Sequence, residues 1–109
     1  MDDETMRRLG GNEAAFRKVN ETLRAGKRLV DAGQRFPFRC ECGVLGCNRL
    51  LELTLPEYEG VRASPTRFVI LDGHEITETE HVVERRARYS VVEKEDEAAV
   101  VAVDTDPRA

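Results

Sequence analysis

The chain has 109 residues, a formal net charge of −4 at pH 7 and 35% charged residues. A chain of this length forms one domain with a modest core, and no apolar run in it approaches the ~18 residues of a membrane-spanning helix. The three cysteines cannot all pair in disulfides, and the first residues lack the apolar stretch of a signal peptide. We therefore expect a cytoplasmic protein with reduced thiols.

The charge is unevenly distributed along the chain. Residues 1–39 hold nine Lys/Arg against six Asp/Glu, whereas residues 40–109 hold eight against fifteen. A mildly basic arm is typical of a solvated helix surface, and the acidic remainder would repel a phosphate backbone. Nucleic-acid binding is therefore the less favoured explanation of the basic arm.

The first predicted element is a long helix. Residues 1–11 are polar and end in two glycines, which indicates a flexible N-terminus, and Asn12 is a good N-cap. Apolar residues then recur at helical spacing, which predicts a helix over about 12–32 that ends near Gly33. The stripe is narrow: Phe16, Val19, Leu23 and Val30. It either packs on its own domain or pairs with a partner or a second copy.

A hairpin and a short helix follow. The segments RFPFRCE and NRLLELTL, over 35–41 and 48–55, predict two strands that enter and leave the cysteine cluster. Thr54 and Glu57 form a capping box with Pro56 in the first turn, which predicts a short helix.

The remaining elements complete the fold class. RFVIL (67–71) and RYSVVEK (88–94) predict further strands, and the capping box of Thr77 and Glu80 predicts a short helix over about 77–86. EAAVVAV (97–103) fits a helix or a strand, and 104–109 is a frayed tail. The order predicts one α+β domain over 12–103, with a small, mainly antiparallel sheet, an N-terminal helix, two short helices and a zinc-knuckle hairpin.

The cysteine cluster predicts a metal site. Cys40 and Cys42 are two positions apart, so they point to the same face of an extended strand. Gly43 and Gly46 allow the chain to turn back sharply and bring Cys47 to the other two. Three sulfur ligands around one point suit zinc, which takes four Cys or His ligands in structural sites.

The fourth ligand comes from a short list. His74 follows a strand and the Asp72-Gly73 turn, which would deliver it in a fixed direction, so we expect His74 to complete the site. His81, a carboxylate or water are the alternatives. Four protein ligands leave no open position for water, which indicates one structural Zn²⁺ per chain.

No pattern in the sequence calls for catalysis. Glu75 beside His74 is one residue too close to match the H-x-E of zinc deaminases, and the P-C-x-x-C partner of that motif does not occur. The sequence also lacks H-E-x-x-H, P-loop and G-x-S-x-G motifs. We therefore expect a protein that is not an enzyme.

Several motifs together resemble a known family. They are NEAAFRKVNE, FRCEC with Cys47, LTLPEYEGVRASPTRF, GHE and VVEK, and the resemblance covers roughly residues 12–108. The chain thereby resembles small, uncharacterised zinc-binding-type proteins of high-GC Gram-positive bacteria. The resemblance implies Cys40, Cys42, Cys47 and His74 as the metal ligands, and it implies nothing about partners.

These observations favour a non-enzymatic, zinc-stabilised binding or regulatory module. It would act through protein–protein contacts, or by self-association, of its N-terminal helix. The alternatives are a zinc-thiolate redox sensor, in which oxidation of the sulfurs releases the metal, and, less favoured, a zinc enzyme or a nucleic-acid binder.

Overall fold

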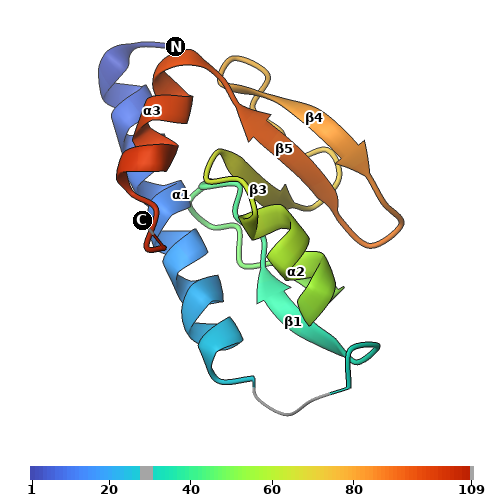
Figure 1. Ribbon diagram of the computed structural model, residues 1–109. Coiled ribbons are helices and arrows are strands. Elements are labelled where there is room, and N and C mark those ends of the chain that lie inside the picture. The colour runs from blue at the N-terminus through green and yellow to red at the C-terminus, as the bar shows by residue number, and fades with distance from the viewer. Residues whose placement is uncertain (28–30, 109) are drawn as a thin grey trace.

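The computed structural model describes residues 1–27 and 31–108. In this part of the chain, the elements follow one another as α1 (Asp3–Ala25), β1 (Arg35–Arg39), β2 (Leu50–Thr54), α2 (Leu55–Arg62), β3 (Arg67–Ile70), β4 (Glu80–Arg85), β5 (Ser90–Lys94) and α3 (Asp96–Asp104). Helix α1 runs along one side of the molecule, and α3 lies beside its first half (Figure 1). The expected α+β fold with small antiparallel sheets is confirmed.

The strands form two small sheets. Strands β1 and β2 pair as an antiparallel hairpin, and the second sheet has the order β3-β5-β4 with both pairs antiparallel. Inward-facing aromatic and aliphatic side chains of both sheets form one core with α2, where the ring of Phe38 stacks on that of Tyr58 at 4.4 Å. The expected capping box of Thr54 and Glu57 begins α2.

The two sheets are joined by the segment that follows β1. The backbone N–H of Glu41 donates to Val69 O at 2.9 Å, and Val69 N–H donates back to the Glu41 carboxylate at 3.0 Å. Leu71 N–H donates to the Sγ of Cys40 at 3.2 Å. The cysteine segment is therefore held along β3, between the two sheets.

Helix α1 has different boundaries from those predicted. It begins at Asp3, whose predecessor Asp2 caps it by accepting from Thr5 N–H at 2.7 Å, so most of the segment expected to be flexible is helical. Gly10 lies inside the helix against α3, where a Cβ would stand 3.0 Å from a Val101 methyl carbon. The helix ends at Ala25, and Val30 of the expected stripe lies outside the described residues.

The buried face of α1 is polar rather than apolar. Glu13, Arg17 and Asn20, which share one face at helical spacing, are each 5% exposed or less. Val19 of the expected stripe is 44% exposed, whereas Phe16 lies half-buried under the Arg39 guanidinium, 3.7 Å from its ring centre. The stripe therefore does not carry the helix onto the core, although Leu23 does pack against it.

The helix predicted over about 77–86 is wrong, because residues 80–85 form β4. The chain makes one turn here, but it is capped at Ile76 rather than by the predicted pair of Thr77 and Glu80: Ile76 N–H donates to the Glu80 carboxylate at 3.0 Å, and Thr79 N–H donates to Ile76 O at 3.0 Å. Beyond that turn, β-branched Val82 and Val83 extend along β5. Residues 80–85 therefore become a strand because they pair with β5, which lies later in the chain.

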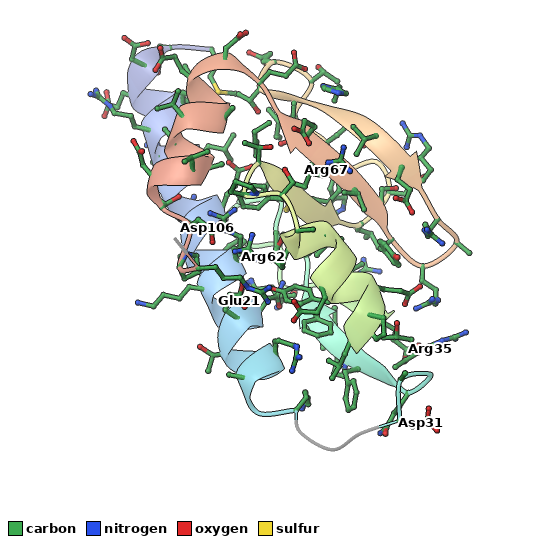
Figure 2. The ribbon with its side chains drawn as sticks, in the orientation of Figure 1. Glu21, Asp31, Arg35, Arg62, Arg67 and Asp106 are labelled. Carbon is green, nitrogen blue, oxygen red and sulfur yellow. The ribbon has the colours of Figure 1, made fainter. Side chains whose placement is uncertain are left out.

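The C-terminal region also differs from the prediction. The ambiguous EAAVVAV segment is helical and forms α3, whose last residue is Asp104. The tail beyond it is tied down: Asp106 pairs with Arg62, and Arg108 pairs with Glu21 at 2.6 Å. Figure 2 shows Arg62, Glu21 and Asp106 grouped where α1, α2 and the tail meet. None of the described helices is long and apolar enough to cross a membrane.

Candidate metal centre

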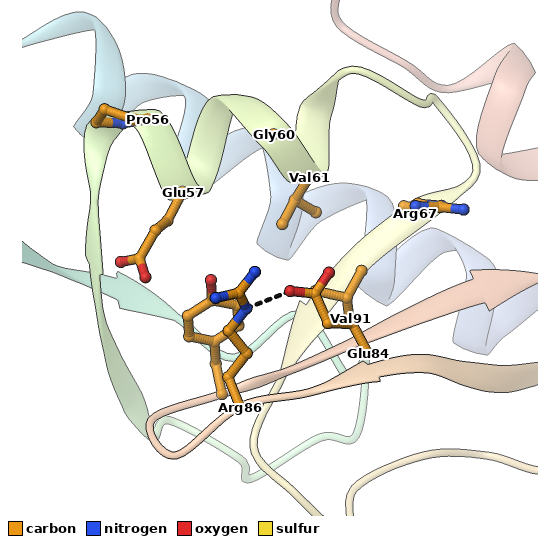
Figure 3. A pocket seen from close by; sticks show the side chains of 9 residues that line it. Pro56, Glu57, Gly60, Val61, Arg67, Glu84, Arg86 and Val91 are labelled. Atoms are coloured by element: carbon orange, nitrogen blue, oxygen red, sulfur yellow. Dashed lines mark hydrogen bonds and ion pairs between the residues drawn. The ribbon is translucent and has the colours of Figure 1, made fainter.

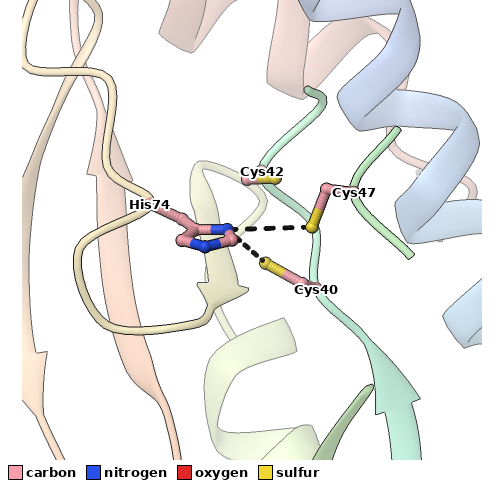
Figure 4. A group of neighbouring side chains, drawn as sticks. All are labelled: Cys40, Cys42, Cys47 and His74. Atoms are coloured by element: carbon pink, nitrogen blue, oxygen red, sulfur yellow. Dashed lines mark hydrogen bonds between the residues drawn. The ribbon is translucent and has the colours of Figure 1, made fainter. Parts of the chain in front are cut away.

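Four ligand-type side chains converge at one point of the fold. The sulfurs of Cys40, Cys42 and Cys47 and a ring nitrogen of His74 all lie within 4.8 Å of one another. His74 Nδ1 is 3.7 Å from the Sγ atoms of both Cys40 and Cys47 (Figure 4). The three cysteines are free thiols. The structure thus brings together the four residues that the sequence predicts as ligands.

The knuckle, residues 40–47, is shaped by two glycines. Gly43 and Gly46 have φ angles of +75° and +91°, which L-residues with a side chain rarely adopt. Cys47 N–H donates to Val44 O at 3.0 Å and closes the turn, while Cys40 N–H donates to Arg49 O at 3.0 Å and continues the β1–β2 ladder. These bonds carry Cys47 back to Cys40 and Cys42.

His74 reaches the cluster from the turn after β3. The backbone N–H of His74 donates to Leu71 O at 3.0 Å, and Gly73, with a φ angle of +88°, reverses the chain just before His74. His81, the sequence alternative, lies on β4 with its side chain 56% exposed and its Nδ1 3.0 Å from a Glu95 oxygen. The geometry therefore favours His74 over His81 as the fourth ligand.

The sulfur atoms share protons unequally. The hydrogen bond from the Cys40 thiol lowers the pKa of Cys42 to about 4, whereas the same bond, together with burial, raises the pKa of Cys40. The side chains of both residues are 1% exposed or less. Several thiolates cannot stay ionised together in such a buried place unless a cation balances them.

The donor set fits a metal ion. Three sulfurs and one imidazole nitrogen make the Cys₃His set that holds structural zinc in a tetrahedral shell, and soft thiolate donors disfavour magnesium and calcium. The ligands come from two loops that are far apart in the sequence, so an ion here would cross-link the β1–β2 hairpin to the turn after β3.

A buried polar pair that was not predicted from the sequence, Glu41 and Asn20, supports the knuckle. Glu41 is fully buried, and burial raises its pKa to about 7. It accepts from Asn20 Nδ2 at 2.9 Å, and the Asn20 amide also exchanges two hydrogen bonds with the peptide groups of Arg39, at 2.6 and 2.7 Å. The sequence holds one sign of this pair, which is the position of Glu41 between Cys40 and Cys42. In an extended strand, successive side chains point to opposite faces, so Glu41 must point away from the two sulfurs.

Two of the hollows on the described surface bear on the question of a site. One, of 290 Å³, borders the metal cluster directly and is lined by Val44, Cys47, Gly73, His74, Glu75 and Ile76. The other, of 320 Å³, lies between α2 and the three-stranded sheet and contains none of the four ligands (Figure 3). Two of its charged residues pair with each other, Arg86 with Glu84, and a third, Arg67, pairs with Glu93 outside the hollow.

Comparison of the chain with protein-family models, with curated proteins and with solved structures finds no match. The resemblance to the actinobacterial zinc-binding-type proteins therefore stays a prediction, and the site is argued from its own residues.

Proposed function

We propose that the protein is a non-enzymatic binding module whose fold is stabilised by one Zn²⁺ ion held by Cys40, Cys42, Cys47 and His74. The observation that carries this proposal is the convergence of four zinc-type ligand atoms within 4.8 Å. Four protein ligands fill a tetrahedral shell and leave no position for a reacting water. That arrangement favours a structural ion over a catalytic one.

The energetic argument supports the same role. The glycine-containing knuckle loses much conformational entropy when it folds. Structural zinc contributes on the order of 10 kcal/mol of apparent binding free energy to small domains near neutral pH. An ion at this site therefore has the strength to fix the knuckle between the two sheets.

We assign partner binding to the outer face of α1. Val19 is 44% exposed there, and its neighbour Phe16 is half-buried beneath Arg39. An exposed apolar side chain on a helix whose opposite face is fully engaged is suited to contact a protein partner or a second copy of the chain. Leu23 belongs to the core instead, so it is not the residue to test.

The metal assignment is tested by elemental analysis after purification without chelator. We expect about one zinc per chain, lost in Cys42→Ser and strongly reduced in His74→Ala. His81→Ala is the matched control, because His81 is exposed and paired with Glu95; it should keep the metal. Folded, metal-free protein, or loss of zinc in His81→Ala alone, would contradict the assignment.

The binding role is tested by sedimentation of the wild type and Val19→Asp over a range of concentrations. We expect the wild type to associate and the variant to stay monomeric with an unchanged unfolding midpoint. Lys18→Asp, an exposed position on the same helix, is the control for added charge. If Val19→Asp and Lys18→Asp sediment like the wild type, α1 is not a surface for self-association.

A further inference from the structure

The three sulfurs differ sharply in their access to solvent. The side chains of Cys40 and Cys42 are 0% and 1% exposed, whereas Cys47 is half-buried and lines the 290 Å³ hollow beside His74. The hollow also contains Gly73 and Glu75. A small solute that enters it would meet the sulfur of Cys47 before either of the others.

The three sulfurs also differ in how firmly the backbone holds them. Cys40 bonds to Arg49 through its N–H and accepts from Leu71 through its sulfur, and Glu41 is fixed to β3 beside it. Cys47 is held only within the hairpin, where its backbone N–H donates to Val44 O and its backbone O accepts from the Arg39 guanidinium, each at 3.0 Å. Cys40 and Glu41 are thus tied to β3, whereas the backbone of Cys47 has no such bond among those of the described residues.

We infer that Cys47 is a modification site for hydroperoxides, and that its oxidation opens the metal centre. This inference rests on the proposed function, because it requires the centre to hold zinc. Sulfur ligands of low exposure are protected from oxidants, and an accessible thiolate close to a second sulfur is suited to reversible oxidation. The ligand atoms within 4.8 Å supply that second sulfur.

The chemistry needs the hydroperoxide as its oxidant and nothing else. The Cys47 thiolate attacks the O–O bond, so that an S–O bond forms, the O–O bond breaks and an alkoxide or hydroxide leaves with the electron pair. The thiolate of Cys40 or Cys42 then attacks the sulfenic sulfur, an S–S bond forms, and hydroxide leaves and takes up a proton to become water. Two sulfurs are oxidised by two electrons in total, and the centre loses two of its four ligands.

The inference is tested on wild-type protein whose zinc content has first been measured as one per chain. Equimolar hydrogen peroxide is added, released zinc is followed with a colorimetric indicator, and cysteines are mapped by alkylation and mass spectrometry. We expect zinc release together with a disulfide that contains Cys47, reversed by a dithiol reductant. A Cys40–Cys42 disulfide as first product, or zinc that stays bound, would overturn the inference.

A matched variant tests whether zinc release depends on the solvent-accessible sulfur of Cys47. Cys47→His replaces the accessible sulfur with a nitrogen ligand and gives the Cys₂His₂ set that also binds zinc. We expect its zinc release by peroxide to be at least tenfold slower than that of the wild type. If the variant binds no zinc, iodoacetamide labelling of zinc-loaded wild type takes its place, and Cys47 should be labelled first. Equal rates for the two proteins, or earlier labelling of Cys40 or Cys42, would refute the special role of Cys47.

The two proposals fail in different ways. Protein that contains no zinc before peroxide is added contradicts the proposed function itself. Protein that holds one zinc but keeps it in peroxide contradicts this inference alone and leaves a purely structural centre.

Discussion

At the residue scale, polar side chains inside the structure take the role that apolar ones usually have. Asn20 uses both ends of its amide to bond the peptide groups of Arg39 and also donates to Glu41. Of these two partners, Arg39 directly precedes Cys40, and Glu41 lies between Cys40 and Cys42. The cysteines could be predicted from the sequence because their spacing is local, whereas Asn20 could not, because no local pattern links a helix position to a peptide group 19 residues away.

The first prediction concerns Asn20 itself. Asn20→Ala removes three hydrogen bonds and leaves the Glu41 carboxylate with one donor fewer in a fully buried place. We expect the free energy of unfolding to fall by about 2–4 kcal/mol. Urea unfolding of zinc-loaded protein measures it, with exposed Lys18→Ala as the control. A loss equal to that of the control would show that the amide does not support the knuckle.

The second prediction concerns Glu13, which lies buried with Glu80 around Lys94. Burial raises the pKa of Glu13 from 4.5 to about 7. Between these values the folded state binds a proton that the unfolded chain has lost. The stability from the neutral carboxyl is therefore complete below pH 4.5 and is lost as the pH rises through about 7.

Glu13→Gln keeps an oxygen acceptor for Lys94 and carries no charge at any pH. We expect the variant to match the wild type near pH 5 and to exceed it by up to about 3 kcal/mol at pH 8. Urea unfolding at both pH values, with zinc saturating, measures the difference, since effects of pH on the ligands are common to both proteins. A difference that does not change with pH would contradict the assigned pKa.

At the element scale, the knuckle and α1 are fitted to each other. Asn12 Nδ2 donates to Gly43 O at 3.0 Å. A Cβ on Gly43 would lie 2.4 Å from Glu13 Cγ and 3.0 Å from Leu9 O. Both knuckle glycines could be predicted from the sequence as turn residues. The contact of Gly43 with α1 could not, because it joins two segments that are far apart in the chain and because Leu9 lay outside the predicted helix.

Two alanine substitutions separate turn strain from this contact. Gly46→Ala introduces strain alone, since its Cβ would meet no described atom within 4 Å, and should cost about 1–2 kcal/mol. Gly43→Ala adds overpacking against α1 and should cost roughly 2 kcal/mol more. Thermal unfolding compares the two variants at equal zinc loading. Equal losses would mean that the knuckle does not press on α1.

The helix predicted over about 77–86 was wrong because a distant strand overrides the local signal. The signal of Thr77 and Glu80 matches a helix start, and the chain does make one turn there. Val82 then pairs with Val92 of β5, which lies beyond it in the sequence, and the pairing resumes at Glu84 after a bulge at Val83. By contrast, the strand prediction for RFPFRCE was correct because its alternation is visible locally, with Phe36 and Phe38 on the buried face.

At the scale of the whole molecule, two kinds of cross-link hold the elements together. On one side, buried Arg62 of α2 pairs with Glu21 of α1 and with Asp106 of the tail. On the other side, Cys40, Cys42, Cys47 and His74 bring the β1–β2 hairpin and the turn after β3 together. The first cross-link consists of ion pairs between side chains of the chain itself, whereas the second would depend on the proposed ion, which a chelator can remove.

Metal removal is therefore expected to act on one part of the molecule. With chelator, hydrogen exchange should rise in residues 36–42 and 49–53, which carry the knuckle. Strand β5 should stay protected, because it is the central strand of its sheet. Exchange measured by mass spectrometry with and without chelator gives this map. A hairpin that stays equally protected after metal loss would mean that the ion does not stabilise it.

The central claim is that three cysteines and His74 bind one zinc ion, and X-ray absorption at the zinc edge tests it most directly. We predict a shell of three sulfurs at about 2.3 Å and one nitrogen at about 2.0 Å, with the nitrogen contribution lost or replaced in His74→Ala and kept in His81→Ala. A shell made mainly of oxygen, or a spectrum of His74→Ala identical to that of the wild type, would contradict the claim.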